Sequence, residues 1–265
     1  MMKRITHIVM LLIALTAVAA AEGPEATFEH SRLRLFDGGR AGATHTTGLG
    51  IQMAQGWKTY WRMPGDAGIP PGFDFSGSEN VASVRILYPR PTRYSSPETG
   101  DSIGYSGQVI FPLQVRLKDP AAAAVLRVKI TYGLCRDVCI PVEATLRRTL
   151  PPAGADPREV ALVKAWLKQV PAPATGALKV AAAEVMEQDG KPVLKLVVHG
   201  AEEGVDILVE GPPLAMFGKP KAVGGAGAYV LPVSGIDEPQ ALKGRALTVT
   251  ILARGRAVEQ KVTLP

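Results

Sequence analysis

The chain has 265 residues, with 30 Lys or Arg against 24 Asp or Glu, and its formal charge of +6 is scattered along the sequence. A nucleic-acid-binding surface would gather such charge into a stripe with interleaved aromatic residues, so we expect no nucleic-acid partner. The two cysteines allow a single intrachain disulfide.

Residues 1–21 are typical of an export signal. Lys3 and Arg4 precede an apolar run over residues 8–18, and alanines at 19–21 provide a small-residue cleavage site. The run is shorter than the ~20 residues that a membrane-spanning helix needs, and no later segment is apolar enough to span a bilayer. We therefore expect a cleaved signal peptide and a mature protein outside the cytoplasm, with no membrane span.

Residues 22–152 are predicted to form a first, all-β domain. Short runs with period-two alternation are separated by Gly and Pro, and no convincing helix interrupts them. This pattern favours a sandwich of immunoglobulin type. The expected strands are 27–36, 48–54, 73–75, 81–88, 108–117 and the two arms of a hairpin around the cysteines.

Two loops of this domain carry candidate functional side chains. Aromatic residues in the loop 56–72 either fill the core at a strand end or form a wall beside the cysteines. The polar loop 94–107 is either a flap or a simple connection. The candidates for shielding or partner contact are Trp57, Tyr60, Trp61, Tyr94 and Tyr105.

The clearest feature of the sequence is the segment 132–141, which contains both cysteines. Apolar and polar residues alternate on each side of it, as in half-buried strands. This predicts a β-hairpin that presents Cys135 and Cys139, with three residues between them, at its connecting end. The alternating apolar residues are Leu126, Val128, Ile130 and Tyr132 before the pair, and Val142, Ala144 and Leu146 after it.

Residues 153–175 are predicted to be a helical connector that packs between domains. Asp156 is suited to the N-cap, Pro157 to the first helical position, and prolines at 171 and 173 end the helix. Strand patterns resume over 176–265, which we interpret as a second, smaller sandwich with a structural or docking role. The fold class is therefore all-β: two immunoglobulin-like β-sandwich domains joined by a short helix.

The sequence lacks the motifs of the common enzyme classes. The sequence has no zinc-protease motif, nucleophile elbow, phosphate-binding loop or dinucleotide fingerprint. Cu(I) binding stays open as an alternative, because Cys135 and Cys139 are soft ligands, although further ligands would have to arrive through folding. The candidates for those further ligands are Met53, Met63, His30 and His45.

Redox exchange requires fewer chemical groups than metal binding does. A disulfide that closes a loop of about five residues contributes only roughly 2 kcal/mol of stability, which is a weak reason to keep one in a domain of this size. An accessible thiolate with a second thiol nearby is enough for exchange, with no cofactor. The neighbouring charges do not identify the attacking sulfur, since Arg136 favours a thiolate and Asp137 opposes it.

Three blocks in the same order resemble the periplasmic N-terminal domain of the DsbD and ScsB thiol-disulfide reductases. They are residues 56–68, 105–113 and 132–141, and the resemblance covers about residues 25–150. It implies an immunoglobulin-like domain in the periplasm that uses Cys135 and Cys139 as its redox pair. In the DsbD branch the second cysteine forms the mixed disulfide, which implies Cys139 here.

The resemblance also implies partners. The chain is expected to act as a thiol-disulfide oxidoreductase that relays electrons from a separate membrane donor to periplasmic thioredoxin-fold proteins. Two features depart from the DsbD branch: its cysteines are separated by more residues than the three found here, and residues 96–101 lack the aromatic that shields its sulfurs. Tyr94 and Tyr105 are the candidates to replace that shield. A copper-tolerance chaperone and a docking module with a static disulfide are the alternatives.

Overall fold

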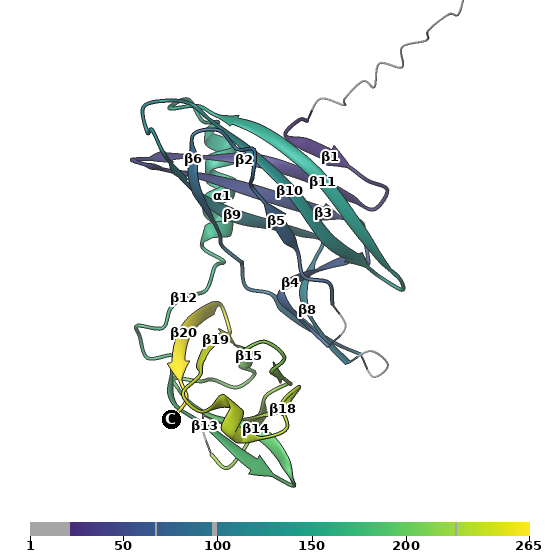
Figure 1. The fold of residues 1–265 in the computed structure, drawn as a ribbon, viewed down its shortest axis with the longest axis vertical. Helices are drawn as coiled ribbons and strands as arrows, with labels where there is room; N and C mark the ends of the chain where they lie inside the picture. Colours follow the sequence, from purple (N-terminus) through teal and green to yellow (C-terminus); the bar gives the residue numbers. More distant parts are fainter. Residues whose placement is uncertain (1–21, 67, 97–99, 226) are drawn as a thin grey trace, which may run out of the picture.

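The computed structural model describes residues 22–66, 68–96, 100–225 and 227–265. The export signal expected over 1–21 and the centre of the expected flap, residues 97–99, lie outside this part of the chain. The fold class is confirmed, since the described residues form stacked β-sheets around two hydrophobic cores, with one α-helix and a short 3-10 turn (Pro239–Leu242). Figure 1 shows the two bodies one above the other.

Two antiparallel sheets enclose the first core. One sheet has the order β1-β2-β3-β9-β6 and the other β11-β10-β4-β8-β7, with β5 paired to β10. Their inward side chains form one continuous apolar cluster, as two facing sheets of a sandwich require. The strands are β1 (Glu25–Thr27), β2 (Ser31–Ala41), β3 (Thr44–Met53), β4 (Lys58–Gly65), β5 (Gly72–Asp74), β6 (Val81–Ile86), β7 (Thr92–Ser96), β8 (Gly100–Ser106), β9 (Gln108–Leu117), β10 (Ala124–Cys135) and β11 (Cys139–Leu150).

The predicted cysteine hairpin is present as β10 and β11. The two strands pair without a register shift from Ala124 opposite Leu150 to Cys135 opposite Cys139. The alternating apolar residues of both arms are buried, whereas Arg127, Lys129 and Thr131 are not. β11 is at the edge of its sheet, so it has a paired strand on one side only.

The single α-helix of the described residues, α1 (Pro157–Leu167), begins as the sequence predicts, with the Asp156 side chain accepting from Arg158 N. We expected it to pack between domains, but its main contacts are on the outer face of β2, β3 and β9, where Val163 meets Phe36 and Ile110. Gly48 makes this approach possible, because a Cβ there would lie 2.7 Å from Ile110 and 3.0 Å from Val163. The alternation of apolar and polar residues in the strands did not reveal that the outer face of this sheet is also buried, under the helix.

A buried carboxylate locks the helix onto that sheet. Glu159 accepts from Arg34 Nη2 at 2.7 Å and from the Asp37 backbone N at 2.8 Å, and pairs with Arg148 Nη2 at 2.7 Å. We expect Glu159→Gln to lower the free energy of unfolding by about 1–3 kcal/mol, because charge-assisted bonds are lost at a buried site. Urea denaturation measures this, with the exposed Glu143→Gln as a control that should change little; equal losses would contradict the anchoring role.

The second domain has its own core between two further sheets, of order β12-β20-β19-β15 and β13-β14-β18-β16, with β17 paired to β18. The first of these sheets lies against the first domain, so that Leu208 and Leu252 join the first core. The two domains therefore share apolar packing. The strands are β12 (Ala172–Pro173), β13 (Lys179–Gln188), β14 (Lys191–His199), β15 (Asp206–Glu210), β16 (Met216–Phe217), β17 (Lys221–Ala222), β18 (Ala228–Ser234), β19 (Ala246–Ala253) and β20 (Arg256–Thr263).

Candidate functional site

The two cysteines form a disulfide across the end of the hairpin. Cys135 is the last residue of β10 and Cys139 the first of β11, and their Cα atoms are 4.1 Å apart. The three residues between them make a tight turn in which Arg136 N donates to Val138 O at 3.0 Å. The strand register thus places the two sulfurs within bonding distance.

The two sulfurs differ in access. Strand β10 lies between β11 and β4, with Cys135 paired to Lys58 on its other side, and Cys135 is 1% exposed. Strand β11 is at the sheet edge, and Cys139 is exposed. Thiol–disulfide exchange requires an approach of the attacking thiolate to one particular sulfur. Here the accessible residue of the pair is Cys139.

Tyr60 of β4 is the predicted aromatic that reaches the disulfide. Its hydroxyl is 3.5 Å from Cys139 Sγ, and its ring packs beside Gly133 and Gly68, where added Cβ atoms would lie 3.3 and 2.6 Å from the ring. Burial raises the pKa of Tyr60, so the hydroxyl keeps its proton throughout the neutral range. Because a disulfide sulfur carries no proton, Tyr60 is the donor in this contact.

Trp57 supports the turn of the hairpin. Its buried ring stacks on His30 at 4.3 Å, and the Arg136 guanidinium lies 5.5 Å from the ring centroid. Arg136 also pairs with Asp137 at 2.9 Å. The two turn charges that gave no preference in the sequence therefore pair with each other.

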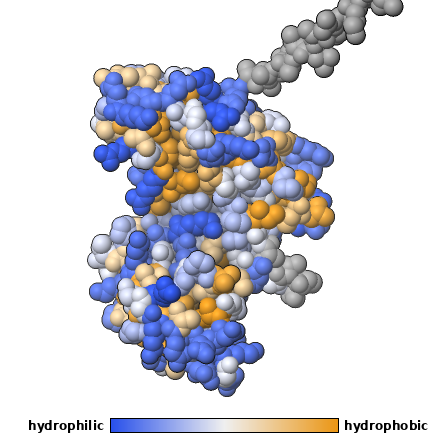
Figure 2. All heavy atoms as spheres, in the orientation of Figure 1, coloured by the Kyte–Doolittle hydropathy of each residue, from blue (hydrophilic) through white to orange (hydrophobic). Residues whose placement is uncertain are grey.

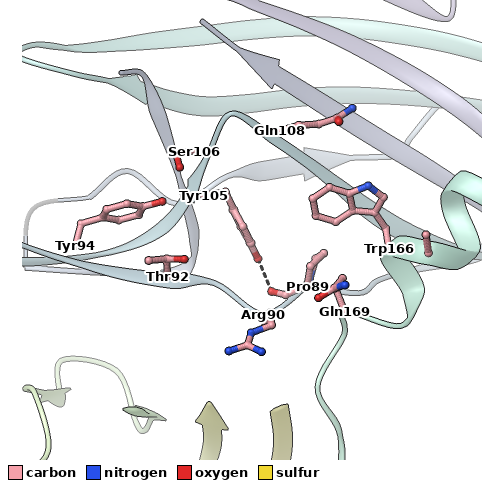
Figure 3. Close-up of a pocket in the computed structure, with 10 residues that line it drawn as sticks. Pro89, Arg90, Thr92, Tyr94, Tyr105, Ser106, Gln108, Trp166 and Gln169 are labelled. Atoms are coloured by element: carbon pink, nitrogen blue, oxygen red, sulfur yellow. Dashed lines mark hydrogen bonds between the residues drawn. The ribbon is translucent and has the colours of Figure 1, made fainter. Parts of the chain in front are cut away.

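The other three predicted aromatics make their contacts elsewhere. Trp61 is fully buried in the first core, with the Arg62 guanidinium 4.4 Å from its ring. Tyr105 donates its hydroxyl to Pro89 O at 2.8 Å, and Lys58 Nζ lies 5.2 Å from the Tyr94 ring. Tyr94 and Tyr105 line a cavity of about 330 Å³ together with Trp166 of α1 (Figure 3). Tyr60 therefore has the position that the flap tyrosines were expected to take.

Exposed apolar side chains lie near the end of the hairpin, and sequence analysis missed them. Val138 in the turn is 63% exposed, and Ile140 and Ile69 are also exposed. Ile69 packs at Gly133, beside the Tyr60 ring. Figure 2 shows hydrophobic surface at the tip of the hairpin. The available signal was the placement of Val138 and Ile140 on either side of Cys139, where a hairpin turn normally carries polar residues.

The side chains considered as further Cu(I) ligands lie in other surroundings. His45 is buried with Nε2 2.7 Å from Asp37 Oδ1, and His30 stacks on Trp57. Met53 is in the first core and Met63 packs against it. Within the described ranges, no three or more His, Cys, Asp or Glu residues are grouped as a metal site. Nor does that part of the chain hold a helix with the length and apolarity to cross a membrane.

Two family models match separate parts of the chain. Residues 32–151 match the family described as "Thiol:disulfide interchange protein DsbD, N-terminal". Residues 169–265 match a domain of unknown function, DUF8393. A comparison with curated protein sequences gives no match.

The chain is also similar in structure to a solved protein. The crystal structure of the N-terminal periplasmic domain of ScsB from Proteus mirabilis superimposes with a TM-score of 0.73 at 20% sequence identity. The match covers 92% of this chain and 98% of that one, so it includes both sandwiches and the helix. At this identity the likeness establishes a shared two-sandwich fold.

Proposed function

We propose that the protein is a periplasmic thiol-disulfide exchange module, because residues 32–151 match the DsbD N-terminal family and carry a disulfide. It relays electrons between a membrane reductase and thioredoxin-fold proteins through Cys135 and Cys139. The observation that carries the proposal is the difference in access between the two cysteines: Cys139 is exposed on an edge strand, and its partner is buried directly opposite.

The exchange follows from this geometry. In the reduced protein the Cys139 thiolate attacks a partner disulfide, forms a mixed disulfide and expels one partner thiolate. The Cys135 thiolate then attacks Cys139 Sγ, re-forms the Cys135–Cys139 bond and releases the partner with both cysteines reduced. Two electrons and two protons pass to the partner in all. The donor reaction is the reverse sequence, with an incoming thiolate attacking Cys139.

The surroundings of Cys139 suit a protein partner. The exposed side chains of Val138, Ile140 and Ile69 offer apolar contact at the end of the hairpin that carries Cys139, and exposed apolar groups of this kind favour an interaction surface. The Tyr60 hydroxyl donates to the sulfur in the disulfide and is placed to donate to the thiolate that forms there. We place the protein in the periplasm, since residues 1–21 have the features of an export signal.

Exchange with a thioredoxin tests the proposal. The oxidised full chain is mixed with a reduced two-cysteine thioredoxin, the reaction is quenched with a maleimide, and modified cysteines are counted by mass spectrometry. We expect two new thiols per chain and an equal loss of thioredoxin thiols, which establishes a two-electron transfer. A disulfide that stays intact with thioredoxin, while a small phosphine reduces it, would contradict exchange with proteins.

A further inference from the structure

The face of β15 that meets the first domain carries a charge at each end. Alternate residues of a strand point to opposite faces. Ile207 and Val209 enter the core of the second domain, whereas Leu208 joins the core of the first. Asp206 and Glu210 share the face of Leu208, and each accepts from an arginine of the first domain. One short strand therefore holds the first domain at two points.

Arg62 is the first of these points. Its Nε donates to both carboxylate oxygens of Glu210, at 3.0 and 2.9 Å, and its Nη2 donates to Glu259 of β20. Its guanidinium also lies over the rings of Trp61 and Tyr88. Burial disfavours the charge, but the two carboxylates outweigh burial and raise the pKa of Arg62 above its ordinary value.

Arg93 on β7 is the second point. Its side chain is 7% exposed, and its Nε donates to Asp206 at 3.0 Å. Nη1 donates to Asp101 of β8 at 3.1 Å, and Nη2 to the backbone oxygen of Ile207 at 3.3 Å. One guanidinium thus ties both strands of the β7–β8 hairpin to the second domain.

The contacts of Arg62 and Arg93 hold β4 and the β7–β8 hairpin, which lie in the same sheet as the disulfide. Arg62 is two residues beyond Tyr60 on β4, in the segment where regular pairing of β4 with β8 is interrupted. Pairing between these strands is regular from Lys58 to Tyr60, so β8 supports β4 where Tyr60 reaches Cys139. Without a second anchor, an irregular segment of this kind would leave the following residues weakly held.

We propose that the second domain is a brace for the redox site, in which Arg62 and Arg93 act as positioning residues that keep the Tyr60 hydroxyl in contact with Cys139. The inference rests on the proposed exchange function and gives the domain over residues 169–265 a role in it. By fixing β4 and the β7–β8 hairpin, the second domain keeps the Tyr60 hydroxyl on one side of Cys139 Sγ and so limits the directions from which the sulfur can be approached. Loss of either contact makes the disulfide easier to reach, although neither arginine touches it.

The test measures how fast dithiothreitol reduces the disulfide in the folded full chain. We expect Arg62→Gln and Arg93→Gln to raise the rate constant by about threefold to tenfold, which lies within the range for residues that couple two sites. Glu210→Gln changes a residue of the second domain only, and it should also raise the rate constant of reduction. Arg147→Gln, which removes an exposed ion pair with Glu79, is the matched control and should leave the rate unchanged.

Two comparisons separate positioning from general stability. Glu159→Gln weakens the contacts of the helix with β2 and with the end of β11 far from Cys139, and it leaves β4 and β8 untouched, so it should destabilise the protein without accelerating reduction. In a double-mutant cycle, Arg62→Gln should add nothing once Tyr60→Ala has removed the cover, because both changes act on the same contact. The proposal would be overturned if the effects of Arg62→Gln and Tyr60→Ala on the reduction rate were fully additive. It would also be overturned if Glu159→Gln accelerated reduction as much as Arg62→Gln.

Failure of the brace and failure of the exchange function give different results. If thioredoxin reduces the wild type but the Arg62, Arg93 and Glu210 variants match Arg147→Gln with dithiothreitol, the brace is wrong and exchange stands. If thioredoxin does not react with the wild type but the three variants are faster with dithiothreitol, the second domain controls a disulfide that has another use.

Discussion

Cys135→Ser is expected to accumulate a mixed disulfide with a thioredoxin-fold partner, whereas Cys139→Ser is expected to form none. In Cys135→Ser the exposed Cys139 thiol remains, and the residue that would resolve the adduct is absent. In Cys139→Ser the remaining thiol is the buried one, between β11 and β4, where a partner sulfur cannot approach it. The different behaviour of the two variants follows from the exposure of Cys139 and the burial of Cys135, and it does not require different pKa values for the two thiols.

The measurement uses a thioredoxin whose resolving cysteine is serine and whose remaining cysteine is activated as a disulfide with thionitrobenzoate. Attack by the protein thiolate expels one coloured thionitrobenzoate anion per adduct, so the release is followed by absorbance and the adduct by non-reducing electrophoresis. We expect Cys139→Ser to match the variant without either cysteine. Equal adduct formation by the two single variants would contradict the assignment of the accessible sulfur.

Tyr60→Ala is expected to accelerate reduction of the disulfide by about tenfold, the factor that corresponds to ~1.4 kcal/mol of lost cover. The Tyr60 hydroxyl lies 3.5 Å from Cys139 Sγ, so removal of the side chain adds a second direction of approach to the sulfur of a residue that is already exposed. Tyr60→Phe retains the ring against Gly133 and Gly68 and should stay close to the wild-type rate. The pair of variants separates steric cover from the hydrogen bond.

Loss of a buried aromatic also costs stability, of the order of 3 kcal/mol. The rates are therefore compared at a temperature where urea denaturation shows every variant to be folded. Because burial raises the pKa of Tyr60, the wild-type hydroxyl stays protonated throughout the neutral range. The ratio of the Tyr60→Ala rate constant to the wild-type rate constant should then be constant from neutral pH to about pH 9, one unit below the ordinary pKa of tyrosine. Faster reduction of Tyr60→Phe than of Tyr60→Ala would contradict the cover.

The sequence was informative where one residue pattern has one structural outcome. Strict alternation around the cysteines predicts a hairpin, and its register then brings Cys135 opposite Cys139. The helix start at Asp156 and Pro157 depends on local capping and is equally readable. These features need no knowledge of distant contacts.

Features that depend on packing between distant segments did not follow from the sequence. Gly48 leaves room for the helix on a face that alternation assigns to solvent. In β15, Asp206 and Glu210 have the pattern of a solvated face and become partners of arginines more than 100 residues away. The difference in access between Cys135 and Cys139 depends on which arm of the hairpin is at the sheet edge. Both arms show the same alternation in the sequence, so the sequence does not tell which arm this is.

Peptide mapping of the mixed disulfide formed by the wild-type chain tests the central claim most directly. The oxidised protein is treated with the reduced single-cysteine thioredoxin, free thiols are alkylated, and the adduct is digested without reduction. We predict that thioredoxin is joined to Cys139 and that the alkyl group is on Cys135. An adduct joined to Cys135, or divided equally between the two cysteines, would contradict the account.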